Sequence, residues 1–175
     1  MKNALIFCFL ACVLVSFAHA EEFPPRKPGL WELTMTDEKG VQVNTMKQCT
    51  DTATDKQMMN MGNDMMSSMG STCAKFEMKK EGDAYIANTD CNFSGSRMVS
   101  KTVTKGDFDS AYSSVSSVTY DPPFMGMSKG SVKIDAKWLG ACSGDQKPGD
   151  IIMSNGMKTS LSAMKDFGKS MPKGN

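Results

Sequence analysis

The stretch SVKIDAKW at residues 131–138 decides the fold class, because apolar and polar residues alternate along its whole length. Its apolar residues are Val132, Ile134, Ala136 and Trp138. A period of two is typical of a β-strand that buries one face and leaves the other in water. This stretch therefore predicts a half-buried strand.

The same alternation recurs upstream in six further runs, each bounded by its own turn signal, at residues 31–36, 41–49, 74–78, 85–93, 97–105 and 108–120. Connections this short permit only antiparallel neighbours. Residues 121–130, with two prolines and two glycines, are expected to form a longer loop. We predict a mainly β fold, an antiparallel meander of about seven strands that is curled into an open barrel or a sandwich so that its apolar face is covered.

Residues 51–69 depart from this period and predict one inserted, methionine-rich helix. Thr52 and Asp55 have the spacing of a capping box, and Gly70 stands where a helix end is expected. We expect a single β-rich domain at residues 21–150 that contains this helix. Residues 151–175 are expected to form a C-terminal tail that includes a short helix.

Residues 1–20 have the order of a secretory signal peptide, with Lys2, an apolar run from Ala4 to Phe17 and a small-x-small end at Ala18 to Ala20. We expect a periplasmic or secreted protein after removal of this segment. No second apolar run approaches the ~20 residues that a membrane helix needs, so no integral membrane segment is expected. A formal net charge of +1 gives no sign of a nucleic-acid partner.

The sequence has one histidine, His19, which lies in the predicted signal peptide. Without it the mature chain has no Ser-His-Asp or Cys-His machinery and no histidine zinc site. We therefore expect no enzymatic activity, no catalytic residue and no cofactor.

Four cysteines follow the predicted signal peptide, Cys49, Cys73, Cys91 and Cys142, and none forms a C-x-x-C pair. An even number in an exported domain predicts two disulfides. Our preferred pairing joins Cys49 to Cys73 around the helix and Cys91 to Cys142. The rival pairing joins Cys73 to Cys91, because a turn at residues 81–83 would place them opposite each other on adjacent strands.

Several of these features occur together in a known family. They are RKPGLWE at residues 26–32, QCT at 48–50, Cys73, Cys91 followed by Phe93, and WLGAC at 138–142. In order and spacing they resemble the bacterial exported family catalogued as domain of unknown function 3617. The resemblance implies a small periplasmic or secreted β-rich protein. Because that family has no established activity, it implies no catalytic or binding residue.

The methionines are the compositional anomaly, because six of the 17 lie within residues 58–69. At helical spacing Met58, Met61, Met65 and Met69 share one stripe, and Met59 and Met66 share an adjacent one. Methionine fills irregular cores, so we expect the first stripe to pack against the sheet and the second to be partly exposed. Thioethers also bind Cu(I), which makes the first stripe a candidate copper site.

Trp31 and Trp138 lie on the first and last expected strands, which adjoin if the sheet closes. They are expected either to form the core at that seam or to line a ligand cavity. With Met59 and Met66 they are the candidate ligand or partner surface. We expect a non-enzymatic exported binding or structural module for a small apolar ligand or an envelope protein partner. The alternative is a protein that binds or buffers Cu(I) through methionine.

Overall fold

The computed structural model describes the backbone of residues 23–68 and 70–170 and most of their side chains. The predicted signal peptide lies outside these residues. The elements in chain order are β1 (Gly29–Asp37), β2 (Gln42–Thr50), α1 (Thr52–Ser68), β3 (Thr72–Glu81), β4 (Ala84–Phe93), β5 (Ser96–Asp107), β6 (Ala111–Phe124), β7 (Met127–Gly140), β8 (Asp150–Met153), β9 (Lys158–Ser160) and α2 (Leu161–Ser170).

The strands form one antiparallel nine-stranded sheet in the order β3-β4-β5-β6-β7-β1-β2-β8-β9. After the run of hairpins from β3 to β7, the chain returns to pair β7 with β1, and this places Trp31 opposite Trp138. The sheet is not closed, because β3 and β9 are its two edges. The predicted mainly β, open antiparallel architecture is confirmed, with two more strands than the seven expected.

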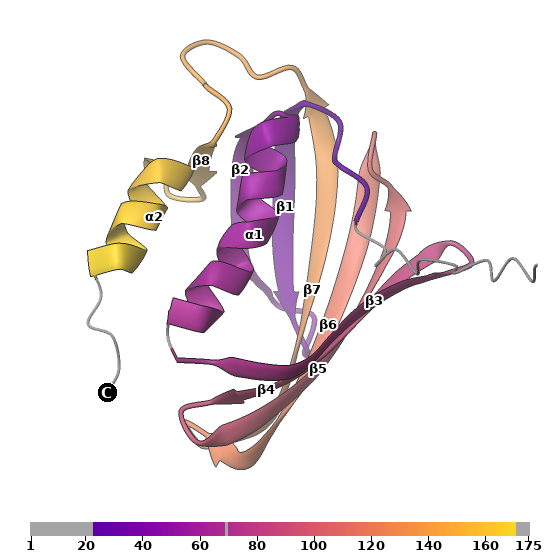
Figure 1. The fold of residues 1–175 in the computed structure, drawn as a ribbon. Coiled ribbons are helices and arrows are strands. Elements are labelled where there is room, and N and C mark those ends of the chain that lie inside the picture. Colours follow the sequence, from indigo (N-terminus) through magenta and orange to yellow (C-terminus); the bar gives the residue numbers. More distant parts are fainter. Residues whose placement is uncertain (1–22, 69, 171–175) are drawn as a thin grey trace, which may run out of the picture.

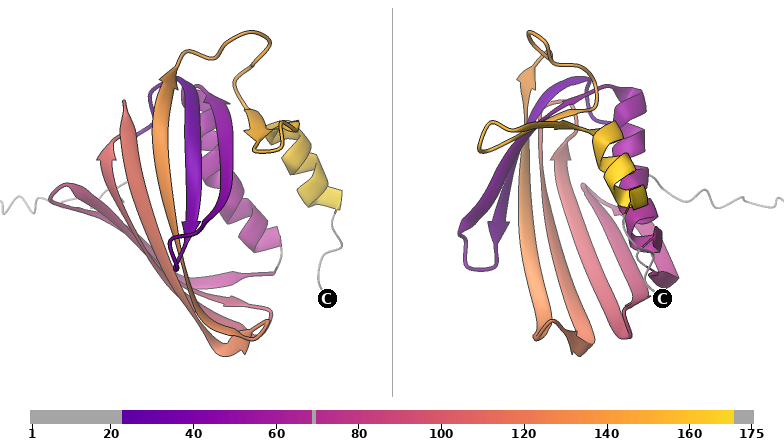
Figure 2. Two further views of the ribbon diagram at one scale, coloured as in Figure 1. Left: turned by 180° about the vertical axis from the view of Figure 1, so that it is seen from behind. Right: turned by 90° about the vertical axis from the view of Figure 1, so that its left-hand side faces the viewer.

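The sheet is strongly curved, and α1 lies on its concave side (Figure 1). This helix runs from the end of β2 to the start of β3, two strands that lie far apart in the sheet, so it crosses the open mouth of the curve. Helix α2 lies beside α1 on the same side, as the two views in Figure 2 show. The core between sheet and helices is centred on Trp31, Leu33 and Ala136.

The C-terminal region from residue 151, expected as a tail, continues the sheet. Strand β8 pairs with β2, β9 pairs with β8, and the short predicted helix follows as α2. Leu161 at the start of α2 is only 4% exposed. Neither helix in the described residues is long and apolar enough to cross a bilayer.

The prediction of a long loop at residues 121–130 is wrong. Strand β6 continues to Phe124, β7 begins at Met127, and a tight turn joins them. Proline has no backbone N–H, but its carbonyl still accepts hydrogen bonds. The Ser96 hydroxyl donates one to the Pro122 carbonyl. The ring of Phe124 packs 5.1 Å from that of Phe93, so aromatic contacts hold the extended hairpin where the turn residues suggested a loop.

The capping box of α1 lies one position earlier than predicted. Asp51 is the cap: its Oδ1 accepts from the backbone N–H of Thr54 at 2.8 Å, and the Thr54 hydroxyl accepts from the N–H of Asp51 at 2.9 Å. Thr52 therefore begins the helix, and Asp55 points elsewhere. Gly70 follows the helix at a positive φ of 78° and donates to the Ser67 carbonyl, as expected.

The preferred disulfide pairing is wrong, and the rival pairing is found. Cys49 is bonded to Cys142, with Cα atoms 5.6 Å apart, and Cys73 to Cys91, with Cα atoms 3.9 Å apart. Cys73 and Cys91 are opposite each other on β3 and β4. Helix α1 carries the chain from β2 to the far edge of the sheet, so it separates Cys49 from Cys73 instead of joining them.

Candidate functional site

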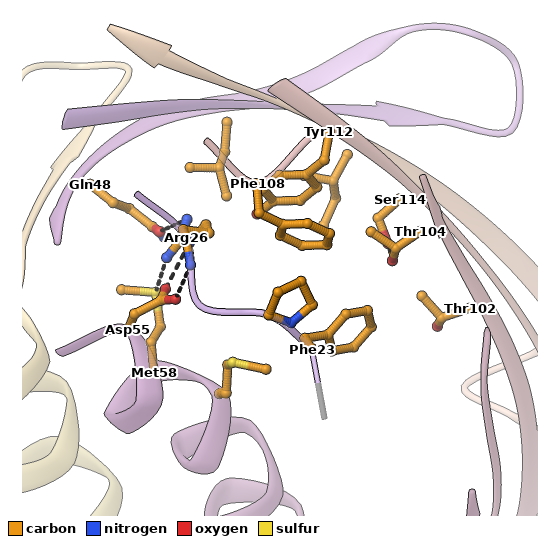
Figure 3. Close-up of a pocket in the computed structure, with 14 residues that line it drawn as sticks. Phe23, Arg26, Gln48, Asp55, Met58, Thr102, Thr104, Phe108, Tyr112 and Ser114 are labelled. Atoms are coloured by element: carbon orange, nitrogen blue, oxygen red, sulfur yellow. Dashed lines mark hydrogen bonds and ion pairs between the residues drawn. The ribbon is translucent and has the colours of Figure 1, made fainter. Parts of the chain in front are cut away.

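A cavity of about 290 Å³ lies between α1, the segment before β1 and the concave face of the sheet (Figure 3). Its apolar lining includes Phe23, Leu33, Met58, Met59, Phe108 and Ile134. Its polar lining includes Arg26, Gln48, Asp55, Thr102, Thr104 and Ser114. The cavity thus combines apolar walls with a few polar groups, which is the usual character of a small-molecule site.

A buried ion pair fixes one side of the cavity. Arg26 is 8% exposed and Asp55 is 2% exposed. The Arg26 Nε donates to Asp55 Oδ1 at 2.7 Å, and the backbone N–H of Arg26 donates to Asp55 Oδ2 at 2.9 Å. The remaining guanidinium nitrogens donate to Gln48 Oε1 at 3.2 Å and to the Met58 sulfur at 3.7 Å. These contacts tie the segment before β1 to α1 and β2.

Aromatic rings form a second wall. The Phe108 and Tyr112 rings are stacked with centroids 5.0 Å apart, and Tyr112 also lies 5.7 Å from the Trp31 ring. Phe23, from the segment before β1, lies 6.3 Å from Phe108 and 5.8 Å from Tyr85. Burial raises the pKa of the Tyr112 hydroxyl above its usual value of 10.0, so Tyr112 remains neutral at physiological pH.

Hydroxyl pairs between neighbouring strands form a third wall. Thr104 on β5 and Ser114 on β6 have their oxygens 2.8 Å apart, and the Thr102 hydroxyl donates to that of Ser116 at 3.0 Å. Each pair is directly opposite in the register of β5 and β6, so all four side chains share the concave face. Thr104 is 3% exposed.

The structure brings part of the predicted methionine set to this cavity. Met58 is half-buried and Met59 is 40% exposed, and both line the cavity. Met61 is half-buried. The side chains of Met65, Met66 and Met69 lie outside the described residues. Within the described ranges, no group of three or more His, Cys, Asp or Glu side chains is placed to hold a metal ion.

The two predicted tryptophans lie at the seam between β1 and β7 and not in the cavity lining. Trp31 is fully buried in the core and donates through Nε1 to the Lys27 carbonyl, so it offers no ligand or partner surface. Trp138 is half-buried, with the Lys27 ammonium 3.9 Å from the ring centroid and its Nε1 donating to the Pro28 carbonyl. The two tryptophans therefore form the core at this seam, which is one of the two roles expected from the sequence.

The ion pair, the Phe23 contact and the hydroxyl pairs were not predicted from the sequence. Arg26 opens the RKPGLWE segment that carries the family resemblance, which could have drawn attention to it, but its partner Asp55 was assigned to the helix cap. Residues 110–117 include five serines. They are polar on both faces, and only the register shows that Ser114 and Ser116 point into the curve.

Comparison with known proteins places this architecture in one family. No curated protein and no solved structure matches the chain. The model of the family described as "Protein of unknown function (DUF3617)" matches residues 26–142. That range begins at the arginine of the buried ion pair and ends at Cys142 of the disulfide to Cys49. The match covers more than half of the chain, and the protein therefore belongs to the DUF3617 family.

Proposed function

We propose that this protein binds one small apolar ligand in the cavity between α1 and the sheet. The observation that supports this most directly is the cavity itself, about 290 Å³ in volume and walled by aromatic, aliphatic and thioether side chains. That volume is close to the lower end of the range for small-molecule pockets, roughly 300–1,000 Å³. A short alkyl chain or a small ring system is of this size.

The walls of the cavity are held in place before any ligand arrives. The Arg26–Asp55 pair fixes α1 against the segment before β1, and the Cys49–Cys142 disulfide joins the ends of β2 and β7 beside it. A site that is already ordered loses little conformational entropy on binding, which favours affinity. This rigidity supports a small ligand over a protein partner for the cavity.

The same geometry supports a non-enzymatic role. Arg26 and Asp55 are engaged with each other, and the hydroxyls of Thr104 and Ser114 are paired with each other, with no base recorded beside them in the described part of the chain. Nucleophilic catalysis needs a hydroxyl next to a group that takes its proton. Two disulfides are typical of oxidising compartments, which fits the predicted export of this chain to the periplasm or beyond.

Titration with N-phenyl-1-naphthylamine, a neutral dye that fluoresces in apolar sites, tests the proposal. We expect saturable binding to the purified protein. Ser114→Phe should abolish it, because the ring would fill the cavity from its floor. Ser117→Phe is the matched control, since Ser117 is on the same strand but exposed on the opposite face, and it should bind the dye normally.

Equal dye binding by the two variants would show that the dye is bound elsewhere and would contradict the proposal. No dye binding by the unmodified protein would contradict it as well. Circular dichroism and the midpoint of urea unfolding confirm that both variants are folded.

Copper binding is the alternative function, and it stays a prediction. Met58, a member of the proposed Cu(I) set, lines the cavity and already accepts a hydrogen bond from the Arg26 guanidinium. A positive charge beside the sulfur disfavours a second cation at the same atom. A Cu(I) competition titration tests this alternative, and affinity no greater than that of the competing chelator would exclude it.

A further inference from the structure

Among the described residues that line the cavity, the charged side chains are Arg26 and Asp55, which together carry no net charge. The Arg26 side chain donates to Asp55, Gln48 and Met58, and Asp55 receives two of its hydrogen bonds from Arg26. Both side chains are more than nine-tenths buried. The charges of this pair are therefore satisfied within the protein, and neither is left to hold an ion.

The cavity does offer neutral hydrogen-bonding groups. In the Thr104–Ser114 pair, the two hydroxyls carry two protons, and the bond between them uses one. The pair can therefore still donate one hydrogen bond and accept others. Thr102 has the same geometry with Ser116. Figure 3 shows Thr102, Thr104 and Ser114 across the cavity from Arg26 and Asp55.

From these two observations we infer that the ligand is an uncharged amphiphile, an alkyl chain or ring that carries a hydroxyl or carbonyl oxygen. Its oxygen hydrogen-bonds to the Thr104–Ser114 pair, and its apolar part lies against Met58, Met59 and Ile134. This inference rests on the proposed function and specifies the class of ligand.

The same groups discriminate against charged amphiphiles. A carboxylate in this cavity would lose its hydration and meet hydroxyls instead of a free cation, and a buried charge without a partner is strongly unfavourable. An ammonium group would lie in the same cavity as the guanidinium of Arg26, without a free carboxylate. Hydroxyl and carbonyl groups lose less hydration free energy on leaving water. A hydrogen bond to the hydroxyl pair compensates for that loss.

The test is displacement of N-phenyl-1-naphthylamine at neutral pH by three ligands of one chain length: decanol, decanoate and decylammonium. We expect decanol to displace the dye at roughly one-tenth the concentration of either charged ligand or less. Displacement by decanoate or decylammonium at the same concentration as decanol would overturn the inference while leaving the proposed function intact. Failure of the dye itself to bind would instead contradict the proposed function.

Decanol partitions into any apolar site better than decanoate, so a second arm tests the hydroxyl pair directly. A double variant, Thr104→Val with Ser114→Ala, removes both hydroxyls; it should weaken decanol binding about fivefold, the value of one hydrogen bond. The matched control is the double variant Thr89→Val with Ser100→Ala. Thr89 and Ser100 form the same kind of pair at 2.7 Å but do not line this cavity, so decanol affinity should not change. Equal decanol affinity in the Thr104→Val, Ser114→Ala variant and the unmodified protein would overturn the role of the pair.

Discussion

At the scale of single residues, the contact between Arg26 and Asp55 joins three parts of the chain that are distant in sequence. It links the segment before β1 to the first turn of α1, and through Gln48 it reaches β2. Both side chains are more than nine-tenths buried, so the two charges depend on each other for their hydrogen bonds. The position of α1 over the cavity follows from this pair.

We expect Arg26→Met to lower the free energy of unfolding by about 3–5 kcal/mol, because it leaves the Asp55 carboxylate buried without its partner. Urea denaturation measures the change. The double variant Arg26→Met with Asp55→Leu should lose less than the sum of the two single variants, since it removes both charges together. A loss below about 1 kcal/mol in the single variant would show that the pair is solvated in solution.

Gly29 is the second residue whose identity the structure explains. Its φ is +137°, and a Cβ there would collide with the Gly140 carbonyl oxygen and Trp138 Nε1. Gly29→Ala should therefore destabilise the protein by about 2 kcal/mol or more, as measured by thermal or urea unfolding. Gly40→Ala is the control, because Gly40 also has a positive φ but its Cβ would meet nothing within 4 Å. Equal losses in the two variants would mean that backbone conformation alone, and not the close approach of β1 to β7, explains the glycine.

At the scale of elements, the capping box of α1 makes a pH-dependent contribution to the free energy of unfolding. Hydrogen bonds from the backbone and side chain of Thr54 hold the pKa of Asp51 below its usual value of 3.8. A depressed pKa in the folded state stabilises the protein fully above 3.8 and less as the pH falls through the folded-state value.

We therefore expect Asp51→Ala to lower the urea midpoint at pH 7. The difference from the unmodified protein should shrink as the pH falls below 3.8, because the protonated carboxyl is a weaker acceptor. Thr52→Ala, one position along, should have little effect at any pH because Thr52 is exposed and does not cap the helix. A difference between Asp51→Ala and the unmodified protein that does not shrink in acid would contradict the contribution of the charged carboxylate to the cap.

The elements were largely predictable from periodicity, and their order in space was not. Alternation at 132–138 and in the six upstream runs located seven strands because each buries one face of a curved sheet. The pairing of β7 with β1 depends on long-range packing at the Trp31–Trp138 seam, which no local pattern encodes. Strands β8 and β9, with four and three residues, are too short to show a period. The hairpin at Met125 was missed because its prolines are typical of loops.

At the scale of the whole molecule, the disulfides differ in the length of chain they enclose. Cys49–Cys142 spans 93 residues and Cys73–Cys91 spans 18. Because a longer loop loses more entropy when it is closed in the unfolded chain, replacing Cys49 and Cys142 by Ala should cost about 4.6 kcal/mol, and replacing Cys73 and Cys91 about 3.2 kcal/mol. Urea unfolding of the two double variants tests the order, and non-reducing peptide mapping tests the pairing. A larger loss for the Cys73–Cys91 variant would contradict the entropic account.

The cavity was the least predictable feature, because its walls come from distant parts of the chain. Phe23 precedes β1, Met58 is on α1, and Thr104 and Ser114 are on β5 and β6. The methionine pattern indicated an adaptable apolar surface, and Met58 and Met59 do line the cavity. The neutral hydroxyls opposite them lie on two strands that are rich in serine and threonine. Which of these side chains face the cavity depends on the register of the strands.

Native mass spectrometry of the protein purified from the cells that produce it shows whether the cavity holds a ligand. We expect a non-covalently bound small molecule on the unmodified protein and on the Ser117→Phe variant, released on collisional activation as an uncharged amphiphile. Ser114→Phe, with its cavity filled, should carry none. A small molecule retained equally by Ser114→Phe, or bare protein in all three samples, would contradict a binding function for the cavity.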